Sequence, residues 1–182
     1  MKKQIAVLVG SLSKQSLNRK IAQFLADNAP ENLQLNFIEI GDLPLYDRDL
    51  DENSPAQYDR IRNEIKNSDG TIWVTPEHNG SIPAVLKNAI DICSRPQGQN
   101  LWVGKPLGVV TAAAAMAGGQ RVGDQLRTMG IHMGMPVYHN QTPISQVYAV
   151  FGEDGKLNNE FVIERLQGFI SGYGKFVAAL SE

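Results

Sequence analysis

The sequence predicts an α/β fold in which a mostly parallel sheet of five strands is covered by helices on both faces. Short apolar runs rich in β-branched residues alternate with amphipathic segments of helical length along the whole chain. A chain of 182 residues is long enough to bury apolar side chains on both faces of such a sheet, and we expect residues 1–182 to form a single domain. With 42% hydrophobic and 20% charged residues, the composition is that of an ordinary soluble globule.

The predicted elements follow one another in regular order. Strands are expected over residues 5–9, 33–40, 70–75, 106–113 and 135–140. Helices are expected over residues 18–29, 55–68, 82–94, 119–130 and 159–180. Five strand–helix units favour the flavodoxin-like strand order 2-1-3-4-5, in a three-layer α/β/α arrangement, over a six-stranded dinucleotide-binding sheet.

Composition and charge exclude several classes of function. A net charge of -2 gives no reason to expect nucleic-acid binding. The apolar run in MKKQIAVLVGS is too short for a signal peptide or a membrane span, so we interpret it as the first strand. The one cysteine, Cys93, is expected to be a buried, inert thiol, and His132 and His139 have no partners at metal-site spacing. We therefore expect no metal, and a reducing cytoplasm is the simplest compartment.

The connection after the first strand, GSLSKQSLNRK, is rich in hydroxyl and amide side chains. In a parallel sheet it lies at the carboxyl end of the strand, where ligands bind. It lacks the spaced glycines of dinucleotide and Walker A loops. Ser11, Ser13, Ser16 and Asn18 are placed to surround a phosphate at the positive end of the following helix. The alternative is a helix cap formed by Ser16 within a solvated loop.

The connection after the third strand begins TPEHNGSIP and has the composition of a fixed, exposed turn. Pro76 restricts the backbone, and Asn79 and Gly80 tolerate positive φ. Such a turn presents main-chain groups in a set geometry, which suits the edge of a flat ring such as isoalloxazine, with His78 on the ring or at its margin. The alternative is an ordinary turn with Ser81 as the N-cap of the next helix.

Together the two connections resemble the NAD(P)H-dependent FMN reductase family, which includes bacterial quinone and chromate reductases of the flavodoxin-like superfamily. GSLSKQSLN is similar to the family's GSLRxxSxN, and PEHNGSIPAVLKNAIDICSR to its PEYNxSxPGxLKNAIDWxSR. The segment LPLYDRDL also looks like the family, and the resemblance runs nearly end to end. The departures are Ser13 for arginine, His78 for tyrosine, Ala84 for glycine and Ile92 for tryptophan.

The resemblance implies that the first connection binds the FMN phosphate and that residues 76–79 contact the ring largely through main chain. A third flavin-facing connection reads TAAAAMAGGQR, with alanines at 112–115 where hydroxyls often lie. Arg121 is expected to contact a nicotinamide phosphate or a second subunit. The implied cofactor-binding residues are Ser11, Ser13, Ser16, Leu17, Asn18, Pro76, Glu77, His78, Asn79, Gly80, Ser81, Thr111, Ala112, Ala113 and Arg121.

The predicted activity is the transfer of electrons from NADPH or NADH, through bound FMN, to quinones, free flavin or similar small acceptors, chromate and azo compounds included, by a ping-pong mechanism. The hydride chemistry belongs to the cofactor, so no catalytic side chain is expected. Two alternatives stay open: a flavodoxin-like electron carrier, and a flavin-free ligand sensor of the same fold. The resemblance implies a dimer or tetramer. The acidic run Asp47, Asp49, Asp51 and Glu52 is expected to be a solvated loop face.

Overall fold

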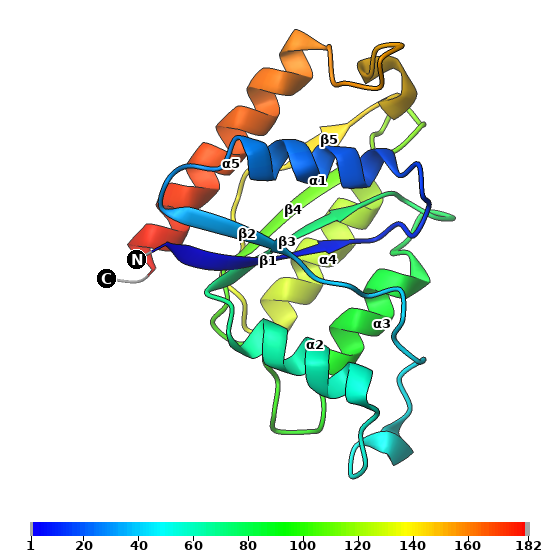
Figure 1. The fold of residues 1–182 in the computed structure, drawn as a ribbon, viewed down its shortest axis with the longest axis vertical. Helices are drawn as coiled ribbons and strands as arrows, with labels where there is room; N and C mark the ends of the chain where they lie inside the picture. The colour runs from blue at the N-terminus through cyan, green and yellow to red at the C-terminus, as the bar shows by residue number, and fades with distance from the viewer. Residues whose placement is uncertain (1, 181–182) are drawn as a thin grey trace.

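The computed structural model describes residues 2–180, in which five strands form one sheet (Figure 1). The strands are β1 (Lys3–Val9), β2 (Leu33–Phe37), β3 (Gly70–Thr75), β4 (Leu107–Ala112) and β5 (Thr142–Ile144). Their order across the sheet is β2-β1-β3-β4-β5, and all four pairings are parallel. The predicted fold class and strand order are therefore confirmed.

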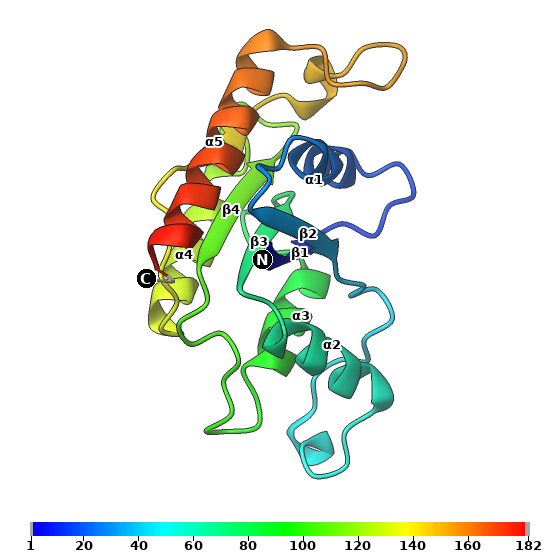
Figure 2. The ribbon, with the colours of Figure 1, turned by 60° about the vertical axis from the view of Figure 1, so that its left-hand side comes forward.

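Helices cover both faces of the sheet, which gives three layers (Figures 1 and 2). One face carries α1 (Leu17–Asp27) and α5 (Glu160–Ala179); the other carries α2 (Ala56–Lys66), α3 (Ala84–Cys93) and α4 (Gln120–His132). Two short 3-10 helices complete the fold: η1 (Arg48–Leu50) and η2 (Val147–Val150). All five α-helices lie close to their predicted positions.

The core is divided into two parts by the sheet, because successive side chains of a strand point to opposite faces. In β1, Ile5, Val7 and Val9 pack in the cluster under α1 and α5, whereas Ala6 and Leu8 pack in the cluster under α2, α3 and α4. A strand buried on both faces is mainly apolar, which is why β1, β3 and β4 are predominantly hydrophobic runs rather than alternating ones. Their buried polar residues are threonines, Thr71, Thr75 and Thr111.

The predicted position of the fifth strand is wrong. Residues 135–140 start along β4, where the Tyr138 N–H donates to the Leu107 carbonyl at 2.8 Å, but they do not continue as a strand. The guanidinium of Arg127 takes the next two carbonyls, those of Tyr138 at 2.7 Å and His139 at 3.2 Å. Pairing with β4 resumes only at β5. A side chain of α4 therefore interrupts the strand that the apolar pattern predicts.

Cys93 ends α3 and its side chain is fully buried. Burial raises the pKa of its thiol to about 12, although the positive charge of Arg62 acts in the opposite direction. The thiol is therefore protonated at neutral pH.

Among the helices of residues 2–180, not one is long and apolar enough to cross a membrane.

Tyr173 of α5 offers a test of how the helix is fixed to the sheet. Its buried hydroxyl lies 3.0 Å from the Thr71 carbonyl and 2.9 Å from the Pro106 carbonyl, and burial raises its pKa. Tyr173→Phe keeps the ring packing and loses this bond, so we expect the free energy of unfolding to fall by about 1–2 kcal/mol. Urea titration measures it. Tyr148→Phe, which alters a hydroxyl on an exposed side chain, should change stability by less than about 0.5 kcal/mol. Equal stability of Tyr173→Phe and the parent would show that the hydrogen bond of the Tyr173 hydroxyl does not stabilise the packing of α5 on the sheet.

Candidate functional site

A cavity of about 310 Å³ opens where β1, β3 and β4 end. Three loops form its wall: the first loop (residues 10–16), the second loop (residues 76–83) and the third loop (residues 113–119), with η2 beside them. The lining residues are Ser11, Ser13, Gln15, Ser16, Leu17, Asn18, Pro76, Glu77, His78, Ala112, Ala113, Ala114, Val147 and Tyr148.

The first loop both caps α1 and leaves donors facing the cavity. Ser16 is the N-cap, and its Oγ accepts a hydrogen bond from the Arg19 N–H at 3.1 Å. The main-chain N–H groups of Leu17 and Asn18, the first two helical residues, have no partner within residues 2–180. Unpaired N–H groups at the positive end of a helix attract anions. The cap and the anion site, which the sequence offered as alternatives, are therefore compatible.

The second loop contains a tight turn closed by two main-chain hydrogen bonds. The His78 N–H donates to the Ser81 carbonyl at 3.1 Å, and the Ser81 N–H donates to the His78 carbonyl at 2.9 Å. Asn79 and Gly80 have φ values of 50° and 75°, as a type I′ turn requires. Within the described chain, the main-chain N–H groups of Glu77 and Asn79 have no partner. The turn thus presents fixed donors.

Hydrogen bonds to α4 hold this turn in place. Gln125 accepts from the Ser81 hydroxyl at 2.9 Å and donates to the Gly80 carbonyl at 3.1 Å. The Glu77 carboxylate accepts from the Val122 N–H at 3.3 Å, one turn into α4. Because Ser81 bonds to Gln125 and α3 begins after Pro83, the alternative of Ser81 as an N-cap is wrong.

The third loop begins with main-chain groups that are already paired. The Ala112 carbonyl accepts from Asn18 Nδ2 at 3.2 Å. The Ala113 N–H donates to the Ile144 carbonyl at 3.2 Å, and the Ala113 carbonyl accepts from the Val147 N–H at 3.1 Å. These two alanines therefore offer the cavity mainly their methyl groups.

The cavity fits a phosphorylated flavin on three observations. The end of α1 offers unpaired N–H groups and serine hydroxyls for a phosphate. The second loop offers unpaired main-chain donors, and the third loop an apolar surface, for a flat ring. Asn18 Oδ1 is buried without a partner within residues 2–180, so a ligand that donates there would satisfy it.

Some of the expected residues lie beside the cavity rather than on its wall: Asn79, Gly80, Ser81, Thr111 and Arg121. Thr111 is buried and donates from Oγ1 to the Gly118 carbonyl at 2.8 Å. The Arg121 side chain is 75% exposed and lies 3.4 Å from Glu77 Oε1. The sequence interpretation missed Gln15 and Ala114, which adjoin expected residues, and also Val147 and Tyr148. The last two carry no motif and follow the strand that was misplaced.

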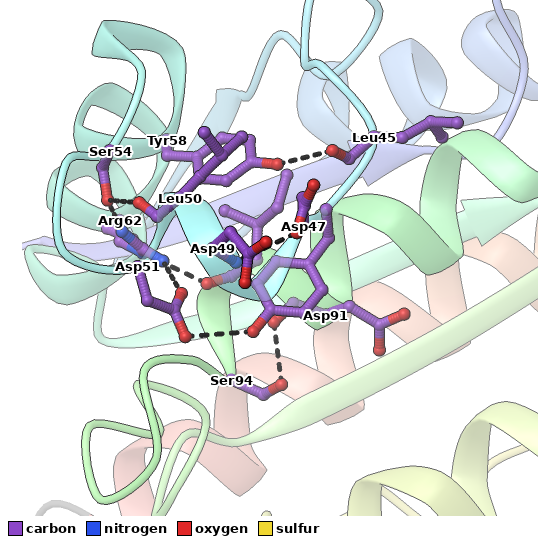
Figure 3. A network of polar contacts seen from close by, with 12 residues as sticks. Leu45, Asp47, Asp49, Leu50, Asp51, Ser54, Tyr58, Arg62, Asp91 and Ser94 are labelled. Atoms are coloured by element: carbon purple, nitrogen blue, oxygen red, sulfur yellow. Dashed lines mark hydrogen bonds and ion pairs between the residues drawn. The ribbon is translucent and has the colours of Figure 1, made fainter.

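A polar network fixes the long connection between β2 and α2 (Figure 3). The Tyr58 hydroxyl donates to the Leu45 carbonyl at 2.7 Å. Asp51 accepts from the Tyr46 hydroxyl at 3.0 Å and pairs with Arg62 at 3.4 Å, with the Asp51 side chain only 16% exposed. The expectation that Asp51 is solvated is therefore wrong, because its carboxylate pairs with the largely buried guanidinium of Arg62.

The asparagine of the KNAID motif, Asn88, belongs to the same arrangement. Its Oδ1 accepts from the Tyr46 N–H at 2.8 Å, and its Nδ2 donates to the Pro44 carbonyl at 2.9 Å. Between these two anchors the Leu45 side chain is 77% exposed. The motif residue thus positions a neighbouring loop and does not reach the cavity.

Comparison with known proteins agrees with this geometry. The model of the family described as NADPH-dependent FMN reductase matches residues 3–149. A quinone reductase of Pseudomonas putida is 42% identical over 175 residues, which are 95% of this chain and 94% of that protein. A quinone reductase of Escherichia coli K12 is 34% identical over 97% of this chain and 96% of its own length.

A solved structure is similar over almost the whole fold. The flavoenzyme FerB of Paracoccus denitrificans, an NAD(P)H:(acceptor) oxidoreductase, superposes with a TM-score of 0.89 at 34% identity. The match covers 97% of this chain and 98% of that one. The chain therefore belongs to the NADPH-dependent FMN reductase family and is an oxidoreductase that uses FMN and NAD(P)H.

Proposed function

We propose that this chain is a quinone reductase in which FMN occupies the cavity of the three loops. The observation that carries the proposal is the union, in one cavity, of an anion-binding helix end and a fixed turn with unpaired donors. The Pseudomonas putida and Escherichia coli relatives, both named quinone reductases, support the choice of acceptor. FMN held there would supply the redox chemistry that links NADPH or NADH to the acceptor, and the residues of the three loops would hold and orient it. Free flavin, chromate and azo compounds are further acceptors under the proposal.

Different residues of the chain would hold different parts of the cofactor. The Leu17 and Asn18 N–H groups and the hydroxyls of Ser11, Ser13 and Ser16 hold the phosphate. The Glu77 N–H group would bind the ring edge, with the Asn79 N–H group beside the cavity as a further donor. The methyl groups of Ala112 and Ala113 would pack beside the ring, and His78 would lie at its margin. No proton needs to be moved by a side chain, so these groups bind and orient and do not act as acid or base.

The proposal extends to assembly and location. We propose one domain over residues 1–182, a dimer or tetramer, and a cytoplasmic protein. The Arg121 side chain is well exposed and lies beside Glu77 of the second loop. We propose that its guanidinium binds the phosphate of the nicotinamide cofactor or contacts a second subunit.

The phosphate site predicts a preference between flavins. If the bonds to the phosphate contribute about 3–6 kcal/mol, riboflavin should bind more weakly than FMN by roughly two to four powers of ten. Quenching of flavin fluorescence during titration of the apoprotein measures both dissociation constants. Equal constants would remove the phosphate from the binding mode.

The wall of the cavity carries no lysine or arginine among the described residues, so phosphate binding depends on N–H groups and hydroxyls. Ser13 is an exposed lining residue where the family often has arginine. Ser13→Arg should tighten FMN binding by about tenfold through one charge-assisted hydrogen bond and leave riboflavin binding unchanged. Ser13→Gln, which adds a hydrogen-bond donor without a charge, is the control for calorimetric titration. A gain for riboflavin as large as that for FMN would show that the arginine does not reach the phosphate.

One cavity that serves both substrates predicts ping-pong kinetics. NADPH and the quinone must approach the same open face of the ring in turn, so double-reciprocal plots at several fixed quinone concentrations should be parallel. Initial rates of NADPH oxidation provide the data. Intersecting lines, together with a trapped complex of enzyme, NADPH and quinone, would require two separate sites.

A further inference from the structure

Asn18, a lining residue of the cavity, carries a buried hydrogen-bond acceptor without a partner among the described residues. The residue is the second of α1, lines the cavity and is 5% exposed. Its Nδ2 donates to the Ala112 carbonyl at 3.2 Å, and its Oδ1 is buried without a partner within residues 2–180. One end of the amide is thus used inside the protein, and the other is left for a ligand.

The orientation of this amide is set by its neighbour. The Ala112 carbonyl can only accept, so a reversed amide would place Oδ1 against another acceptor and lose the existing bond. Ala112 belongs to β4 and is paired there with Ile144 of β5, which keeps its carbonyl in place. The atom of the amide that is left without a partner is therefore oxygen and not nitrogen.

An acceptor discriminates between the parts of a phosphorylated flavin. A phosphate near neutral pH is largely a dianion that offers acceptor oxygens, so it gains nothing from Asn18 Oδ1. The hydroxyls of the ribityl chain are donors, and they lie between the phosphate and the ring. Asn18 has the matching position, because its side chain crosses from α1, beside the first loop, to Ala112 at the end of β4, directly before the third loop.

We infer that the Asn18 side chain accepts a hydrogen bond from a ribityl hydroxyl of the flavin and so reads the sugar-alcohol chain rather than the phosphate. The inference rests on the proposed binding of FMN in this cavity. The two polar groups of Asn18 then have different roles: the side chain binds the ribityl chain, and the main-chain N–H binds the phosphate. Ribityl recognition then depends on a residue whose other hydrogen bond holds the third loop.

The test compares three flavins that differ in their chains: FMN, riboflavin, and lumiflavin, which has the same ring without a ribityl chain. Asn18→Ala should weaken FMN and riboflavin by the same factor, about three- to tenfold, and leave lumiflavin unchanged. Ser13→Ala, on the phosphate side, is the matched control and should weaken FMN alone. Thermal unfolding of each apoprotein checks that the variants are folded.

Other results would overturn the inference. Loss of FMN affinity with unchanged riboflavin affinity would make the Asn18 side chain a phosphate ligand. An equal loss for all three flavins would make it only a tether of Ala112. Failure of the proposed binding of FMN, on which the inference rests, is distinguishable, because it shows in the parent protein as equal affinities for FMN and riboflavin, whatever Asn18→Ala does.

A second measurement keeps the inference testable if Asn18→Ala fails to fold. FMN analogues that each lack one ribityl hydroxyl are titrated against the parent protein, and one of them should bind about three- to tenfold more weakly. Against Asn18→Leu, an apolar side chain of similar size, that analogue and FMN should bind equally, which completes a double-mutant cycle. If every analogue binds the parent as tightly as FMN does, the inference fails.

Discussion

Parallel pairing of β1, β3 and β4 is the constraint on which the rest of the structure depends. Parallel strands all end at one edge of the sheet, so connections far apart in sequence meet there. The approach is close: a Cβ on Gly10 would overlap the side chain of Thr75, and the Gly10 N–H donates to the Val74 carbonyl at 2.9 Å. A glycine at the end of β1 therefore lets the first loop leave the sheet directly beside the second.

The segments at this edge are joined by hydrogen bonds between parts of the chain that are distant in sequence. Asn18 reaches from α1 to Ala112, Glu77 reaches from the second loop to Val122, and η2 binds the third loop through Val147. Each bond joins a segment to one that is distant in sequence. In a site where the cofactor supplies the chemistry, the chain contributes position, and such cross-bonds are what fix it.

Much of this could be read from the sequence because it is encoded locally. The apolar periodicity of four strands and five helices is a property of neighbouring residues, and Asn79-Gly80 specifies its own turn. The bounds of β5 depend on Arg127, a residue of another element that captures the carbonyls of the expected strand. Asp51 became part of a network because Arg62 faces it across the loop. Tyr148 lines the cavity from η2, the short helix that follows β5, and the prediction of a wrong position for β5 left this segment unassigned. Periodicity cannot report such tertiary partners.

The burial of Cys93 has a chemical consequence if quinones are the substrates, as proposed. Quinones are electrophiles, and a thiolate adds to their ring carbons to give a covalent thioether. An enzyme that turns them over repeatedly would be arylated at any accessible, ionised cysteine. Here the one cysteine of the sequence is buried, and burial raises the pKa of its thiol to about 12, which disfavours the reactive thiolate at neutral pH. The packing of α3 against the sheet thus protects the catalyst from its own acceptor.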